Sequence, residues 1–205
     1  MSKIFVIGCN KTATTTLHRI FLRNNLTSQH ATRWDLENYE CFSDNGDMKN
    51  VEHLDITYPG SKYVLNTRSL KGWLCSRFKH GDRYSKPNWA YPCTVFKCAQ
   101  WAQHRHAHHC KVLSYFATRP EKLIIVDIDL PGWERFVCDT LSLAIHDIPP
   151  AFVRPFNDTQ AHKSIINTVE AYFDQTQVTP STNLTNHQDV DLDMLRVYNN
   201  TYINI

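Results

Sequence analysis

The sequence lacks any long apolar run and any signal for secretion. No stretch of its 205 residues approaches the roughly 20 consecutive apolar residues that a membrane-spanning helix needs. Residues 1–3 lead directly into the apolar run 4–8, which is too short and too soon followed by polar residues to be the core of a secretion signal. We therefore expect a cytoplasmic protein without a membrane span.

The sequence also has no large excess of positive or negative charge. The formal net charge is +2, from 22 basic and 20 acidic residues. This balance gives no reason to expect a nucleic-acid partner, because such binding depends on a surplus of basic side chains. Any site for an anion must therefore be built locally. No feature of the sequence specifies an oligomeric state.

The sequence has no even, closely spaced set of cysteines. Its seven cysteines lie at positions 9, 41, 75, 93, 98, 110 and 138. An odd number, scattered over predicted helices and strand ends, argues against a disulfide framework and favours a reducing compartment.

Cysteine and histidine crowd between residues 93 and 110, as in some zinc sites. On a continuous helix, Cys93 and Cys98 lie about 140° apart around the axis, which is poor for joint ligation. His104 and His108 are four residues apart and could chelate a metal in solution. The simpler interpretation is a long helix with one histidine facing a cleft and the others solvated, and we expect no metal site.

Apolar segments alternate with amphipathic ones, which is typical of an α/β fold. Residues 3–8 form a continuous apolar run, as expected of a parallel strand buried on both faces, and 14–25 follow with a helical apolar face. Residues 41–60 are polar and rich in turn formers, so we expect mostly loop, with room for one short helix. The other predicted elements are a weak strand at 27–33, a strand at 63–67, helices at 70–80 and 92–118, a strand at 123–128, and helices at 131–143 and 161–173.

This alternation predicts a three-layer α/β/α fold with a central parallel sheet and right-handed crossovers. We assign residues 1–174 to one domain and 175–205 to a polar C-terminal tail, packed on the surface or partly disordered. In such sheets ligands bind at the carboxyl ends of the strands. The loops after Gly8 and after Thr67 are therefore expected at the same edge.

Residues 8–16, Gly-Cys-Asn-Lys-Thr-Ala-Thr-Thr-Thr, follow the first strand and open a helix. The free N–H groups and the dipole of a helix N-terminus form an anion site. Lys11 adds a full positive charge, and Thr12, Thr14 and Thr15 add hydroxyl donors. The alternative is a capped first turn beside a solvated lysine.

The loop differs from the Walker A pattern, which places Gly-Lys-Ser/Thr after four variable positions. Here the lysine comes three residues after Gly8, and the loop contains no Gly-Lys pair. This difference weakens an assignment as an ATPase or a kinase.

The same loop resembles the 5′-phosphosulfate loop of the sulfotransferase family, which typically reads Pro-Lys-Ser/Thr-Gly-Thr-Thr after a first strand. Residues 10–15, Asn-Lys-Thr-Ala-Thr-Thr, match it with two departures, Asn10 for proline and Ala13 for glycine. A glycine there would allow a positive φ, whereas an alanine is comfortable only if φ stays negative.

A second match lies downstream. Members of the family hold a 3′-phosphate with an arginine that ends a strand and a serine eight positions later. Arg68 and Ser76 have this spacing. Arg68 offers a planar fork to a phosphate, and Ser76 lies about two helical turns further on. Taken alone, the pair could equally be a surface ion-pair residue and a small packing residue.

Three further stretches resemble the short, single-domain branch of the family. Residues 58–68 resemble its lead-in to the arginine, and 119–134 resemble its later strand and Gly-Trp-Glu turn. Residues 155–158 are a weaker match. The resemblance covers about residues 3–160 and leaves the tail outside.

The resemblance implies a P-loop-like nucleotide-binding fold and transfer of a sulfuryl group from 3′-phosphoadenosine 5′-phosphosulfate (PAPS) to an acceptor hydroxyl or amine, with no metal required. Lys11 would stabilise the leaving phosphate. The residues implied in binding the donor are Lys11, Thr12, Ala13, Thr14, Thr15, Thr16, Arg68, Ser76 and Lys163. The size of the chain favours a small molecule, a lipid or a sugar as the acceptor over a long polymer.

The acceptor's proton needs a base. Asp44 is the first candidate, because similar sequences carry a Phe-Ser-Asp before the arginine strand, and His30 and Asp35 come next. Each has a plain alternative as a solvated loop residue. Many family members stack adenine on an aromatic residue after the two threonines. Thr16 occupies that position here, so Trp73 or Trp133 would have to serve.

Two other functions stay open. The first is a nucleotide or small-molecule kinase with a degenerate phosphate loop, which would bind ATP and magnesium. The second is a non-catalytic module that keeps the nucleotide-binding fold and uses its tail to bind a partner.

Overall fold

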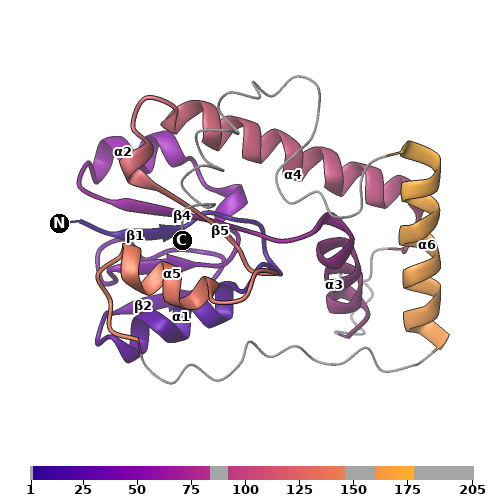
Figure 1. Ribbon diagram of the computed structural model, residues 1–205. Helices are drawn as coiled ribbons and strands as arrows, with labels where there is room; N and C mark the ends of the chain where they lie inside the picture. Colours follow the sequence, from indigo (N-terminus) through magenta and orange to yellow (C-terminus); the bar gives the residue numbers. More distant parts are fainter. Residues whose placement is uncertain (1, 84–91, 146–159, 178–205) are drawn as a thin grey trace.

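The computed structural model describes residues 2–83, 92–145 and 160–177, and its fold is α/β, as predicted. A five-stranded, all-parallel sheet with the order β2-β3-β1-β4-β5 lies at the centre (Figure 1). The strands are β1 (Ile4–Val6), β2 (Ser28–His30), β3 (Cys41–Ser43), β4 (Lys62–Thr67) and β5 (Leu123–Asp127). The helices are α1 (Thr14–Arg23), α2 (Val51–Thr57), α3 (Leu70–Arg83), α4 (Val95–Phe116), α5 (Trp133–Thr140) and α6 (Gln160–Thr176), with short helical turns η1 (Gly46–Met48) and η2 (Pro120–Lys122).

Helices cover both faces of the sheet and make the three layers. On one face, α1 and α5 pack Leu17, Phe21 and Val137 against Val6 and Val126. On the other face, α2 and the second half of α4 enclose a core rich in aromatic side chains (Figure 1). Nearly all residues of β1, β4 and β5 are buried on both faces of the sheet, which explains why these strands lie in apolar runs of the sequence.

A second apolar cluster lies beside the sheet. The first half of α4 packs there against α3 and α6, through Trp73, Phe78, Trp101, Val169 and Phe173. α4 therefore belongs to two cores, one under the sheet and one beyond its carboxyl edge. This double role accounts for its length of 22 residues.

The expectation of mostly loop at residues 41–60 was wrong, although the one short helix allowed there is present as α2. This segment contains strand β3, the turn η1 and helix α2. β3 has only three residues, all of them buried, and is too short to show a period in the sequence. The weak strand predicted at 27–33 is confirmed as β2, and the other predicted elements are present with ends shifted by a few residues. Residues 155–158 and the tail beyond 177 lie outside the described residues.

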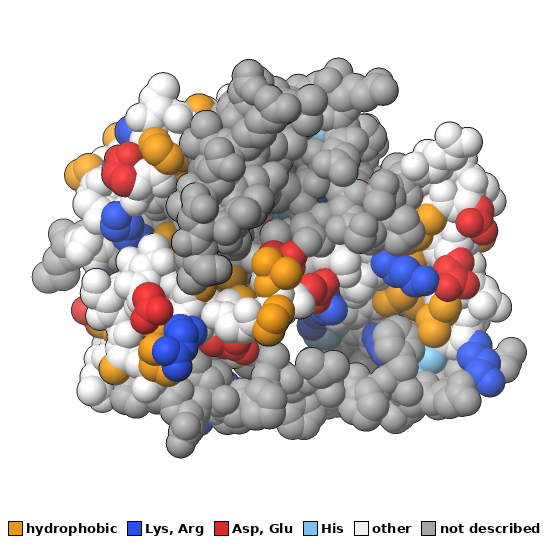
Figure 2. All heavy atoms as spheres, in the orientation of Figure 1, with side chains coloured by type: hydrophobic (Ala, Val, Ile, Leu, Met, Phe, Trp, Pro, Cys, Tyr) orange, Lys and Arg blue, Asp and Glu red, His pale blue; other side chains and the backbone are white. Residues whose placement is uncertain are grey.

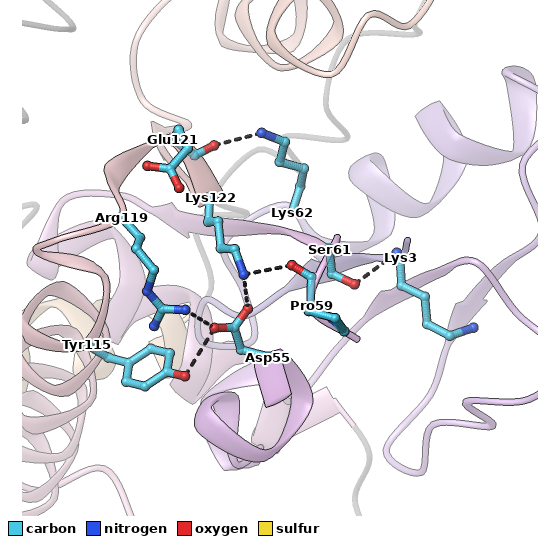
Figure 3. Close-up of polar contacts among 9 residues, drawn as sticks. All are labelled: Lys3, Asp55, Pro59, Ser61, Lys62, Tyr115, Arg119, Glu121 and Lys122. Carbon is cyan, nitrogen blue, oxygen red and sulfur yellow. Dashed lines mark hydrogen bonds and ion pairs between the residues drawn. The ribbon is translucent and has the colours of Figure 1, made fainter. Parts of the chain in front are cut away.

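An ion-pair cluster holds the amino edge of the sheet together (Figure 3). The carboxylate of Asp55 on α2 is buried and accepts hydrogen bonds from Tyr115 (3.1 Å), Arg119 and Lys122 (2.7 Å). Lys122 also donates to the carbonyl of Pro59 at 2.7 Å. Asp55 thus joins α2 to the end of α4 and to the turn that leads into β5, at the edge opposite the predicted site.

The described surface carries a mixture of charges. On the face seen in Figure 2, acidic and basic side chains alternate and form no large patch of one sign among the coloured residues. Within residues 2–83, 92–145 and 160–177, no helix has the length and apolar character needed to cross a lipid bilayer.

Candidate nucleotide-binding site

The loop between β1 and α1 has an unusual backbone. Lys11 and Ala13 both lie in the left-handed region, with φ of 68° and 63°. Ala13 is the N-cap of α1, and its side chain caps none of the N–H groups of the first turn. A loop of this kind, followed by an uncapped helix N-terminus, presents backbone N–H groups to an anion.

Asn66 on β4 supports the loop from the sheet. Its side chain accepts a hydrogen bond from the N–H of Gly8 at 3.0 Å and donates to the carbonyl and hydroxyl oxygens of Thr12 at 2.5 and 2.6 Å. A Cβ on Gly8 would come within 2.1 Å of the Asn66 carbonyl oxygen, so glycine is required there. The sequence analysis missed Asn66, which could have been noticed as a polar residue near the end of an apolar strand.

Two helices hold the other side of the loop. The indole N–H of Trp73 on α3 donates to the carbonyl of Asn10 at 2.9 Å. His108 on α4 lies 2.6 Å from the carbonyl of Ile7, and because a carbonyl can only accept, Nε2 of His108 carries the proton. Both side chains are buried, so the loop is preorganised rather than left to fold around a ligand.

The threonines of the loop divide into two groups. Thr12 and Thr14 are buried, and the hydroxyl of Thr12 donates to the carbonyl of Cys9. The side chain of Thr12 therefore supports the loop. Thr15 is exposed and Thr16 half-buried on the first turn of α1, where hydroxyl groups can reach a phosphate.

From the sequence, an alanine at position 13 is unstrained only if its φ is negative. In the structure Ala13 has a positive φ of 63°. An L-residue with a Cβ is strained there by about 1 kcal/mol, and glycine is not. We predict that Ala13→Gly stabilises the protein by up to about 1 kcal/mol in urea unfolding. The matched control is Ala107→Gly on the exposed face of α4, where the same change should cost about 1 kcal/mol. Equal losses in the two variants would contradict this prediction.

Arg68 directly follows β4 at the same edge of the sheet. Its guanidinium lies along the first turn of α3, because a Cβ on Gly72 would come within 3.0 Å of Nη2. Its Nη2 is 3.3 Å from a carboxylate oxygen of Asp129, and both side chains keep about a third of their surface or less exposed, 27% and 34%. Ser76 is half-buried in α3, about 9 Å along the helix from Leu70. Lys163 is exposed on α6, which packs against α3.

Arg105 on α4 is a buried cation that the sequence did not single out. It is 3% exposed and donates to the hydroxyl of Thr67 at 2.8 Å and to the carbonyl of Arg68 at 2.6 Å. Burial lowers the pKa of Arg105 to about 10, which still leaves it charged at pH 7. It holds the end of β4 and adds a second positive charge behind Arg68.

The candidate bases lie on the other side of the loop. His30 at the end of β2 is 3.0 Å from the hydroxyl of Ser43 through Nδ1 and 3.2 Å from the hydroxyl of Thr15 through Nε2. Burial lowers the pKa of His30, the charge of Asp44 opposes this shift, and the charge of Lys11 adds to it. His30 is therefore neutral at pH 7 and has the protonation state that a general base needs.

Asp44 follows β3 directly, in a left-handed conformation with φ of 76°. Its charge acts on both His30 and Lys49, which places it in the same corner of the site. Asp35 is different, because its carboxylate accepts hydrogen bonds from Glu37 and Asn38 within its own turn. The structure thus brings His30 and Asp44 together and leaves Asp35 apart.

Neither predicted tryptophan has an open face for adenine. Trp73 is fully buried between the guanidinium groups of Arg77 and Arg105, 5.2 and 5.4 Å from its ring. Trp133 is 6% exposed and packs in the core of the α1 and α5 face. Both proposals for adenine stacking are therefore wrong, because the rings are core residues.

The histidines of α4 have individual roles. His104 pairs with Asp47 at 3.1 Å, His108 supports the loop between β1 and α1, and His109 is fully buried. In the described part of the chain, no three side chains of the metal-binding types gather around one point. All seven cysteines are free thiols.

The strand order arranges these groups in a row. β1 carries the loop at the centre, its neighbour β4 carries Arg68 on one side, and β3 and β2 carry Asp44 and His30 on the other.

Comparison with models of known protein families gives no match, and comparison with curated proteins gives none either.

Proposed function

We propose that the protein is a sulfotransferase that binds PAPS across the carboxyl edge of the sheet. The observation that carries this proposal is the presence of two neighbouring sites with basic side chains at the ends of adjacent strands. One is the loop with Lys11 and the uncapped α1 N-terminus, and the other is Arg68. PAPS has phosphate groups at its 5′ and 3′ positions, and the two sites would take one each.

The reaction would run in line through the sulfur atom. The acceptor oxygen forms a bond to sulfur while the bond from sulfur to the bridging oxygen breaks, and the electron pair stays on the departing phosphate. Lys11 stabilises that growing negative charge together with the N–H groups of the loop. The acceptor's proton passes to His30 or Asp44, on the side of the loop away from Arg68.

The acceptor would approach from the side of β2 and β3. The half-buried groups there, His30 and Asp44, suit a small molecule, a lipid or a sugar hydroxyl better than a long charged polymer. The net charge of +2 agrees with this choice, because a sulfated or phosphorylated polymer would favour a broad basic surface.

Calorimetric titration with adenosine 3′,5′-bisphosphate tests the donor site. We expect binding that does not depend on magnesium and that Arg68→Ala weakens about 100-fold, because charge-assisted hydrogen bonds to phosphate are lost. Arg135→Ala, which removes an exposed arginine on α5, is the control and should bind normally. Binding of ATP with magnesium, but none of the bisphosphate, would contradict the proposal and favour a kinase.

A further inference from the structure

An acidic side chain occupies the position next to Arg68 where a phosphate would bind. The carboxylate of Asp129 accepts a hydrogen bond from the backbone N–H of Ser69 at 2.8 Å, and its other oxygen lies 3.3 Å from Nη2 of Arg68. One backbone N–H at the start of a helix and one guanidinium are the donors that a phosphate would use. Asp129 therefore acts as an internal substitute for the anion.

The charges around this position cancel. Arg68 and Arg105 supply two positive charges, and two carboxylates face them, from Asp127 at the end of β5 and Asp129 on the loop that follows. Asp127 also accepts a hydrogen bond from the N–H of Asp129 at 2.9 Å, which fixes the turn between them. A phosphate arriving at Arg68 therefore meets a balanced site in which a carboxylate already holds its donors.

We infer that Asp129 lowers the affinity of the site for the nucleotide, because it competes with the 3′-phosphate for Arg68 and Ser69. The inference rests on the proposed function, because it concerns the same site. To bind the bisphosphate, the protein must break the contacts of Asp129 and bring a dianion close to a carboxylate. Asp129 thus weakens the binding of both the donor and the bisphosphate product, and it favours release of the product after transfer.

The variant Asp129→Asn isolates this effect. Asparagine keeps an oxygen that can accept from the N–H of Ser69, so the start of α3 stays capped, while the negative charge is removed. In calorimetry we expect it to bind adenosine 3′,5′-bisphosphate about tenfold more tightly than the wild type. Adenosine 5′-monophosphate lacks the 3′-phosphate, and its affinity should stay within about twofold.

Two controls complete the experiment. Asp139→Asn removes an exposed carboxylate on α5 and should leave both affinities unchanged. In an Arg68→Ala background, Asp129→Asn should lose most of its effect, since the carboxylate no longer has a cation to occupy. Asp129→Ala, with thermal unfolding measured beside it, serves as a second variant should the asparagine disturb the turn.

The outcomes separate the inference from the proposed function. If the wild type binds the bisphosphate and neither Asp129 variant binds it more tightly, the inference is overturned and the proposed donor site stands. If neither the wild type nor the variants bind the bisphosphate, Arg68 is not a phosphate site. Both the inference about Asp129 and the proposed function are then overturned. Tighter binding of adenosine 5′-monophosphate to the same degree would also overturn the inference, because the effect would then be a general change of charge.

Discussion

Replacement of Lys11 by alanine is expected to slow sulfuryl transfer by about 10³-fold while the protein stays folded. Removal of one preorganised group that stabilises charge in the transition state costs roughly that much in turnover. The measurement is release of adenosine 3′,5′-bisphosphate from PAPS in the presence of a panel of hydroxyl acceptors. Binding of the bisphosphate should fall much less than turnover, because the loop N–H groups and Arg68 remain.

The control for Lys11 is Lys111→Ala, which removes an exposed lysine on α4 that pairs with Glu52 at 3.6 Å. It should leave turnover and binding unchanged. Lys11→Ala keeps a non-glycine residue at φ of 68°, so the backbone strain of the loop is the same in both forms. Wild-type turnover in Lys11→Ala would exclude a catalytic role for this lysine. Absence of turnover in the wild type itself, with binding of the bisphosphate intact, would favour a non-catalytic binding module.

Asp55→Asn is expected to destabilise the fold by about 3 kcal/mol at pH 7, measured by urea unfolding. The carboxylate is 3% exposed and accepts hydrogen bonds from three donors, two of them cationic. An asparagine would leave Arg119 and Lys122 without a counter-charge and would turn an amide NH₂ toward donors. Asp139→Asn, an exposed position on α5, should change stability by less than about 0.5 kcal/mol.

The effect of Asp55 depends on pH in a defined direction. Burial by itself raises the pKa of Asp55, but the hydrogen bonds from Lys122, Arg119 and Tyr115 outweigh it and lower the pKa in the folded protein. A lowered pKa stabilises the fold above the unfolded pKa of about 4, and this stabilisation is lost as the pH falls through the folded value. The gap between wild type and Asp55→Asn should therefore be largest near neutral pH and shrink below about pH 4. A gap that widens in acid would contradict this assignment.

Much of the fold could be predicted because two of its strands are long and largely apolar. β4 and β5 have six and five residues, and the residues inside the sheet are apolar for most of their length. β3 could not be found this way, because Cys41–Ser43 is too short to show a period and its burial depends on pairing with β1 and β2. Short strands in the middle of a sheet depend on tertiary contacts that a local pattern does not contain.

The candidate site was predicted in outline but not in its supporting contacts. The order of Lys11 and Arg68 along the chain was enough to place them at one edge of the sheet, since the carboxyl ends of parallel strands coincide. Asn66, His108 and Arg105 were missed because they come from different elements and meet only in three dimensions. Trp73 was misjudged for the same reason, as a side chain that supports the loop is hard to distinguish in sequence from one that contacts a ligand.

The length of α4 has a mechanical consequence for the site. His108 of this helix donates a hydrogen bond to the carbonyl of Ile7, just before the Lys11 loop. Arg105, about one helical turn away, donates to the carbonyl of Arg68. One helix thus fixes the distance between the loop that carries Lys11 and the backbone of Arg68. We therefore expect the site to select ligands by the spacing of their charges as well as by the number of charges. Any change that shifts α4 along its axis would move both positions together.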